Sequence, residues 1–167
     1  MTVEFDIKLT SRDMYRFNMY QIYSGVHGWV SVLAAILFWV MAGRNYGEVT
    51  MTYTILYIAF GFVFLLYLPI TLYVRSKHSI AASEVLSDTL HYAVGETGFQ
   101  VSQGEASAEL KWEQIYRMVA TKHNVLVYSN RVNAYVIPRE QLGEAYVPLA
   151  ELANAKLAKH RVKMRMC

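Results

Sequence analysis

Few residues of this chain have the types and spacings that catalysis or metal binding requires. The five histidines are scattered, with no two at the spacing of a metal-binding pair, and Cys167 is the only cysteine. No nucleotide-binding glycine loop, serine-hydrolase motif or zinc-protease motif is present. The carboxylates that follow the apolar part fall at predicted turns or on polar strand faces, where they are normally hydrated: Glu96, Glu105, Glu109 and Glu113. We therefore expect no enzyme, no cofactor and no metal site.

The charged residues that do exist are distributed very unevenly. They make up 17% of the 167 residues, against about 25% in an ordinary soluble domain. Between Phe17 and Val74 the only ones are Arg44 and Glu48, whereas the rest of the chain has the usual density. A charge-free part is thus joined to a water-facing part, which excludes a wholly soluble protein, a disordered protein and a disulfide scaffold.

The charge-free part contains two apolar stretches, residues 25–43 and 51–74, separated by a short turn at 44–50. As helices they would measure roughly 28 and 36 Å, against a hydrocarbon core of about 30 Å. Two buried helices of a soluble core are the less favoured alternative, because neither stretch has the polar stripe that such helices carry. We expect an antiparallel transmembrane hairpin.

The distribution of basic and aromatic residues predicts how this hairpin lies in the membrane. Basic residues flank its two outer ends, and Arg44 alone lies in the turn, so that both termini are expected in the cytoplasm. The flanking residues are Lys8, Arg12, Arg16, Arg75 and Lys77. Aromatic residues near the expected membrane–water interfaces are Tyr20, Tyr23, Trp29, Trp39, Tyr46, Tyr53 and Tyr73.

Three features inside the spans have two interpretations each. Pro69 predicts a kink in the second span, either tolerated or used as a hinge. Ser31 and Ala35 form a small-residue pair that either packs the two spans together or marks an oligomer face. His27 has no intramembrane charged partner, so a position among the lipid headgroups is favoured over a proton relay.

The water-facing part has the period-two alternation of β structure. Residues 3–9 alternate between apolar and polar, and a helix over 10–24 begins with a capping pattern. A helical linker is expected at 75–89, followed by a domain over 90–165 in which six short alternating segments are separated by turns. A C-terminal helix is expected near Pro148.

The edge of the C-terminal sheet needs a partner strand, because an open edge promotes aggregation. The only other predicted strand, residues 3–9, lies on the same expected side of the membrane, so we predict that it joins this sheet. The fold class is then an α+β membrane protein. Seven antiparallel strands capped by one C-terminal helix match the element count of a pleckstrin-homology-like barrel, into which the transmembrane hairpin is inserted after the first strand.

Several residues of the β domain resemble the YcxB-like family of bacterial membrane proteins, and the order of the parts along most of the chain is similar too. The residues concerned are Trp112, Ile115, Tyr128, Ile137 and Pro138. The resemblance implies two membrane helices in the bacterial cytoplasmic membrane and a small β domain, and it implies no catalytic residues. Read on their own, these residues are expected to be structural.

The net charge of +3 arises from a basic C-terminal segment, so a general nucleic-acid surface is not expected. This segment either contacts anionic lipid or forms a solubilising tail, and Arg139 either pairs within the protein or binds a ligand. The possible contact residues are Arg139, Lys159, Arg161, Lys163 and Arg165.

The leading expectation is a membrane-anchored binding module that recognises a protein partner or a lipid headgroup. An immunity protein that neutralises a membrane-targeting toxin is the first alternative. A ligand-gated membrane effector that oligomerises through its helices is the second.

Overall fold

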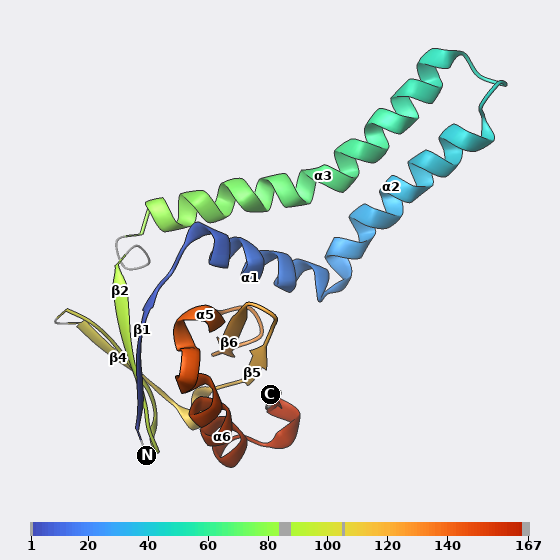
Figure 1. Ribbon diagram of the computed structural model, residues 1–167. Helices are drawn as coiled ribbons and strands as arrows, with labels where there is room; N and C mark the ends of the chain where they lie inside the picture. Colours follow the sequence, from blue (N-terminus) through green and yellow to red (C-terminus); the bar gives the residue numbers. More distant parts are fainter. Residues whose placement is uncertain (1, 84–87, 105, 165–167) are drawn as a thin grey trace. The chain divides into compact units, whose positions relative to one another are not determined.

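The chain has an α+β fold whose two parts are separate units. The computed structural model describes residues 2–83, 88–104 and 106–164, with residue 27 described by its backbone alone. One unit, here the β unit, comprises Met1–Arg16 with His78–Cys167; the other, here the helical unit, comprises Phe17–Lys77. The β unit is therefore assembled from both ends of the chain, and the helical unit is an insertion within it (Figure 1).

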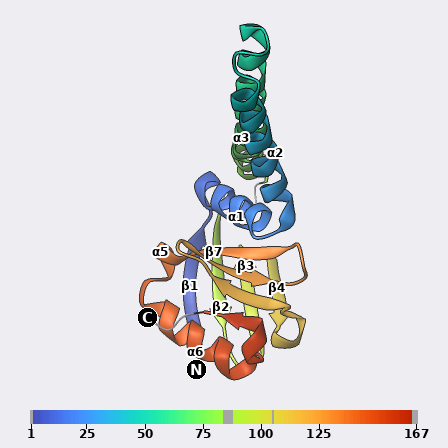
Figure 2. The same ribbon diagram turned by 90° about the vertical axis from the view of Figure 1, so that its right-hand side faces the viewer.

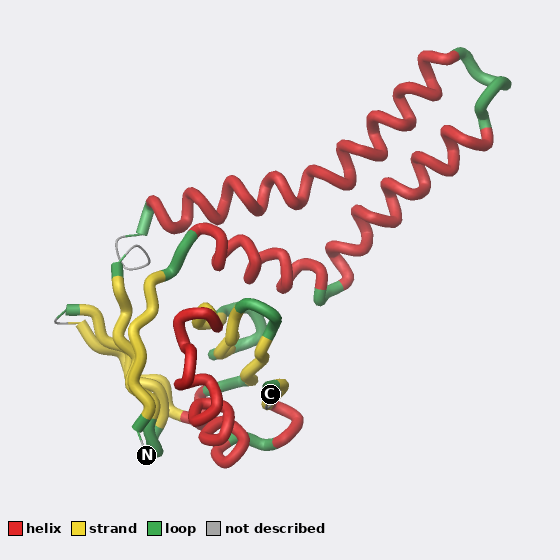
Figure 3. The backbone as a smooth tube through the Cα atoms, in the orientation of Figure 1, coloured by secondary structure: helices red, strands yellow, loops and turns green. Residues whose placement is uncertain are grey.

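Sheet A of the β unit consists of four antiparallel strands in the order β1-β2-β3-β4. The strands are β1 (Val3–Lys8), β2 (Thr89–Val94), β3 (Gly98–Gln103) and β4 (Ala106–Lys111). Buried and exposed residues alternate strictly along β1, as the sequence predicts for a half-buried strand. β1 pairs with β2 over its whole length, which is the partnership expected for the N-terminal strand (Figure 3).

Sheet B contains the remaining strands in the order β7-β6-β5-β8, and β7 runs across the strands of sheet A (Figure 2). Its strands are β5 (Arg117–Ala120), β6 (Asn124–Tyr128), β7 (Ala134–Pro138) and β8 (Val162–Lys163). The expected number of seven strands is wrong by one, because β8 is too short to show alternation. It pairs in parallel with β5. Val162 and Met164 on either side of Lys163 are buried, so the C-terminal segment as far as Met164 belongs to the folded unit and is no loose tail.

Helices and single turns complete the β unit. They are η1 (Trp112–Gln114), α5 (Arg139–Leu142), η2 (Gly143–Ala145), α6 (Tyr146–Lys156) and η3 (Lys159–Arg161). The C-terminal helix predicted near Pro148 is α6, and it buries Leu149, Ala150 and Ala153 in the core. Trp112, the first residue of η1 after β4, donates its indole N–H to the carbonyl of Gly95 at 3.0 Å and packs edge-on against Phe99. These contacts join α6 and the end of β4 to the sheet core.

A side chain from α5 covers the free edge of sheet A. The Gln141 amide accepts a hydrogen bond from the backbone N–H of Lys8 at 2.8 Å and donates one to the carbonyl of the same residue at 2.9 Å. The side chain thereby pairs with β1 as a further strand would, at the edge that faces away from β2. The unpaired edge of a sheet promotes association with other chains, and this contact covers part of the edge of β1.

Replacing Gln141 by alanine should therefore weaken the β unit. Because the two lost hydrogen bonds are solvent-exposed, the expected loss is about 1 kcal/mol of unfolding free energy. Thermal unfolding in a mild detergent, followed by far-UV circular dichroism, measures it. Glu140→Ala, a change of the exposed neighbour in the same short helix, is the control. An equal effect of both substitutions would show that the amide pairing contributes nothing.

The helical unit is a hairpin of two long helices preceded by the end of a third. α1 (Ser11–Tyr23) begins within the β unit; α2 (Val26–Arg44) and α3 (Met51–Ala81) lie side by side (Figure 1). The predicted capping box starts α1, with Thr10 and Asp13 each accepting a hydrogen bond from the other's backbone N–H. Asn18 on α1 donates to the buried hydroxyl of Ser76 on α3 at 3.0 Å.

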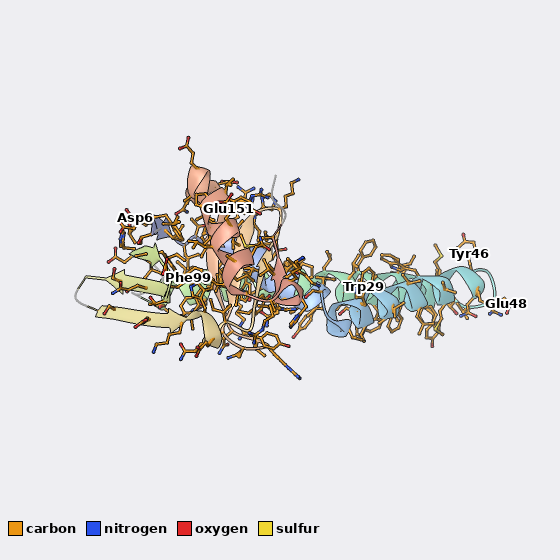
Figure 4. All side chains as sticks on the ribbon, turned by 90° about the horizontal axis from the view of Figure 1, so that it is seen from below. Asp6, Trp29, Tyr46, Glu48, Phe99 and Glu151 are labelled. Carbon is orange, nitrogen blue, oxygen red and sulfur yellow. The ribbon has the colours of Figure 1, made fainter. Side chains whose placement is uncertain are left out.

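The contact between α2 and α3 depends on an aromatic residue and a glycine. Trp39 donates its indole N–H to the Ile58 carbonyl at 3.3 Å and packs edge-on against Phe62. A Cβ at Gly61 would overlap the Trp39 ring. Ala35 is fully buried in the hairpin, which supports its role in packing. Many of the large apolar side chains of α2 and α3 are exposed, and side chains project from both helices in Figure 4.

Among the helices of the described residues, α3 is the one that by itself is long and apolar enough to cross a membrane. A second crossing is counted only if Ser11–Tyr23 and Gly28–Arg44, which are bent by 73°, form one broken span. α3 contains Pro69, is bent in Figure 1, and continues through the predicted linker as far as Ala81. Residues 84–87 of that linker, like the side chain of His27, lie outside the described residues.

Replacing Gly61 by leucine should separate the two long helices. The added side chain would occupy the position of the Trp39 ring, and such overpacking costs about 1–3 kcal/mol. Thermal unfolding of the detergent-solubilised protein measures the loss. Gly43→Leu is the matched control, because a Cβ there meets no atom within 4 Å. If Gly61→Leu were as stable as Gly43→Leu, the close contact would not hold the hairpin together.

Candidate functional site: a cavity between the two sheets

The β unit contains a cavity of about 430 Å³ where the two sheets diverge. This volume lies within the range of small-molecule sites. β4 is the last strand of sheet A and β7 the first of sheet B, and each presents an edge that the described pairings leave open. The wall is formed by Leu9, Met14, Leu90, Tyr92, Val101, Ser102, Gln103, Ala106, Ser107, Ala108, Ala134, Tyr135 and Val136.

The cavity is partly open to solvent along β4, whose lining residues Ala106, Ser107 and Ala108 are small and exposed. Strand register places Phe5, Tyr92, Val101 and Ala108 in one row across sheet A. The first three are large, and the row ends in alanine. Ala106, two residues earlier on the same strand, lies on the same face and also lines the cavity. A leucine or phenylalanine at these positions would fill the space that alanine leaves.

The chemistry of the described wall is uniform: no lining residue is an acid, a base or a histidine. Most of its surface is apolar, and its polar side chains are those of Tyr92, Ser102, Gln103, Ser107 and Tyr135. Burial raises the pKa of Tyr92 above its ordinary value of about 10, and the nearby Tyr135 phenol raises it further. Tyr92 is therefore an uncharged hydrogen-bond donor at neutral pH.

The residues selected from the sequence lie elsewhere. Among the aromatic residues, Trp29, Tyr46, Tyr53 and Tyr73 are exposed on the helical unit (Trp29 and Tyr46 are labelled in Figure 4), whereas Trp39 packs between its helices. Tyr20 and Tyr23 are half-buried on α1. Lys8, Arg12, Arg75 and Lys77 of the basic flank are exposed, and Arg16 lies 3.8 Å from Asp13.

The possible ligand contacts are also outside the cavity. The guanidinium of Arg139 lies 4.2 Å from the centre of the Tyr146 ring, a cation–π contact within the protein. Lys159 and Arg161 lie in η3 and Lys163 in β8, whereas Arg165 is outside the described residues. The charged residues and motifs of the sequence do not indicate the cavity. The feature that could have indicated it is the pair of alanines on β4, Ala106 and Ala108, that line it.

The five residues that carry the family resemblance form part of the core. Trp112, Ile115, Tyr128, Ile137 and Pro138 are all buried. In the described residues no cluster of three or more histidine, cysteine, aspartate or glutamate side chains could hold a metal ion. The conspicuous residues of the β domain thus stabilise the fold, and the cavity lies beside them.

Comparison with known families gives a match in this same part of the chain. Residues 94–153 match the family model described as YcxB-like protein. This segment is YcxB-like. The resemblance noted from the sequence is confirmed, and the matched segment contains β3 to β7 and most of α6. No curated protein and no solved structure matches the chain.

Neutral Tyr92 has a consequence at high pH. Because its folded-state pKa is raised above that of the unfolded chain, its contribution to stability is intact below about pH 10 and is lost as the pH rises further. The unfolding free energy of the unmodified protein should fall more steeply above about pH 10 than that of Tyr92→Phe. Thermal unfolding at a series of pH values tests this, and parallel curves for the two proteins would contradict it.

Proposed function

We propose that this YcxB-like protein is a membrane-anchored, non-catalytic binding module. The observation that carries the proposal is the exposed apolar surface of α3. In its most apolar stretch only 11% is buried within the protein, whereas a core helix of a soluble protein would be mostly buried. Exposed apolar patches larger than a few hundred Å² are rare on soluble monomers. A bilayer removes this surface from water.

The positions of the exposed aromatic residues support a spanning orientation. Tyr53 and Tyr73 are both exposed on α3, and the helical rise places them about 30 Å apart, close to the thickness of the hydrocarbon core. No charged residue lies between them. Trp29 lies near the start of α2 and Tyr46 in the turn that follows it, so aromatic residues lie near both ends of α2 as well. We therefore propose that α2 and α3 cross the membrane as an antiparallel hairpin.

The basic residues support the orientation of this hairpin. Lys8, Arg12 and Arg16 precede it, Arg75 and Lys77 follow it, and the turn contributes Arg44 alone. Under the positive-inside rule, both ends of the hairpin and hence the whole β unit face the cytoplasm. Exposed Lys159 and Lys163 would then be available to anionic lipid headgroups, which attract each basic residue by about 1 kcal/mol.

The β unit is the binding part of the proposal. Seven strands in two antiparallel-rich sheets followed by α6 support a pleckstrin-homology-like architecture, into which the hairpin is inserted after β1. The class of partner, a protein or a lipid, is proposed by analogy with the fold. The cavity supports the presence of a binding site in the β unit. The proposed cellular location is the bacterial cytoplasmic membrane.

A second candidate is a ligand-gated membrane effector, and the cavity is the observation that favours it. In this candidate, the ligand binds in the cavity of the β unit. The hairpin then responds within the membrane and provides the surface through which the protein oligomerises. Toxin neutralisation stays a prediction of the sequence alone.

Cysteine labelling in intact cells tests the membrane topology. Glu48→Cys, made together with Cys167→Ser, places one thiol in the exposed α2–α3 turn, and the unmodified protein has one at Cys167. An impermeant maleimide should label the turn in intact cells and Cys167 only after permeabilisation. Labelling of Cys167 in intact cells would refute the orientation. Release of the protein from membranes by alkaline carbonate would refute the membrane anchor itself.

A further inference from the structure

We propose that the cavity between the two sheets binds an uncharged, mainly apolar molecule that carries a hydrogen-bonding group, such as a long-chain alcohol. The inference deepens the proposed binding function and rests on it. It names a ligand class that differs from the anionic headgroups expected from the sequence.

The absence of charge in the described wall argues for an uncharged ligand. Moving an ionised group from water into an apolar site costs several kcal/mol unless a counter-charge or hydrogen bonds replace its hydration. Thirteen described residues line the cavity, and none of them is ionisable near neutral pH. The basic residues that could pair with an anion, including Arg139 and Lys163, are not part of the wall.

The apolar wall argues for a ligand that is largely hydrocarbon. Leu9, Leu90, Val101 and Val136 present aliphatic side chains from sheet A, from sheet B and from the segment that precedes α1. Enclosed apolar cavities of about 150 Å³ bind apolar molecules, and this cavity, which is partly open to solvent, has room for a larger one. A hydrocarbon chain gains dispersion contacts with the apolar side chains along this wall.

Two tyrosines provide a polar position for the ligand's hydrogen-bonding group. Tyr92 comes from sheet A and Tyr135 from sheet B, and both line the cavity. Tyr92 is 2% exposed and its ring stacks on Phe5 at 5.4 Å, so the ring is held in place by packing. A hydroxyl or ester oxygen near this pair would exchange hydrogen bonds with a neutral donor, without a charge on either partner.

Photo-labelling of the full chain in lipid nanodiscs tests the inference. The probe is a long-chain alcohol with a diazirine in its chain, and the comparator is the fatty acid of equal length, whose carboxylate is ionised near neutral pH. We expect alcohol adducts on peptides from β2, β3 and β7 that an excess of unlabelled alcohol removes. We expect the acid to give about tenfold fewer of them, equivalent to about 1.4 kcal/mol. Equal labelling by the acid would overturn the assignment to uncharged ligands.

Filling the cavity should abolish these adducts. Ala108→Phe adds a ring on the inward face of β4, and Ala134→Leu adds bulk from the opposite wall. Glu109→Phe, one residue along β4 and on its other face, is the matched control. Either cavity variant should reduce the saturable adducts about tenfold, with the control unchanged and all three retaining the circular dichroism of the folded protein. Unchanged adducts in both cavity variants would overturn the inference.

Labelling of the hairpin peptides distinguishes a failure of the cavity-ligand inference from a failure of the membrane proposal. The lipid-like probe should label α2 and α3 without saturation, because lipid surrounds them in the proposed topology. Labelled hairpin peptides with unlabelled cavity peptides would refute the cavity ligand alone. Hairpin peptides protected from the probe would refute the membrane anchor.

Discussion

The pairing of β1 with β2 is the interaction on which the rest of the structure depends. Six residues from the start of the chain pair in full register with six residues that follow the helical unit. This single ladder closes the β unit around the insertion, buries Phe5 against Tyr92 in a stacked arrangement and brings Leu9 to the cavity wall. The Gln141 amide on the outer edge of β1 pairs with the backbone of Lys8 at its end. Without this pairing, sheet A would lose an edge strand, and the backbone edge of β2 would be open to water.

The first turn of α1 is also held by contacts within the β unit. The Thr10–Asp13 capping box starts the helix directly after β1, and the Asp13 carbonyl accepts a hydrogen bond at 3.2 Å from the buried amide of Asn124 on β6. A polar contact between a helix start and a buried strand is specific, because its geometry has few alternatives. Both sheets therefore take part in holding the first turn of the helix that leads out of the β unit.

The two units follow different packing rules. In the β unit, buried and exposed residues alternate strictly along β1, all five residues of β6 are buried, and the strand rows that reach Ala106 and Ala108 border the cavity. In the helical unit, packing depends on small residues: Gly61 admits the Trp39 ring, and Ala35 is buried. Large apolar side chains there face outward, as a lipid environment favours. The matched family segment lies wholly in the β unit, at residues 94–153.

The amino-acid sequence by itself determined the α+β class, the long apolar helices, the first strand and the alternating strands that follow, because hydrophobic periodicity is a local property of consecutive residues. It identified Trp112 and Ile137 as structural, and both are buried. Only the tertiary structure decided that the strands form two sheets, that a two-residue strand near the C-terminus joins one of them, and that Trp39 packs between helices. It alone decided the cavity, because an empty space depends on which side chains from distant segments face each other. Periodicity places Ala108 on the inward face of its strand, but it does not show that sheet B leaves the space in front of it open.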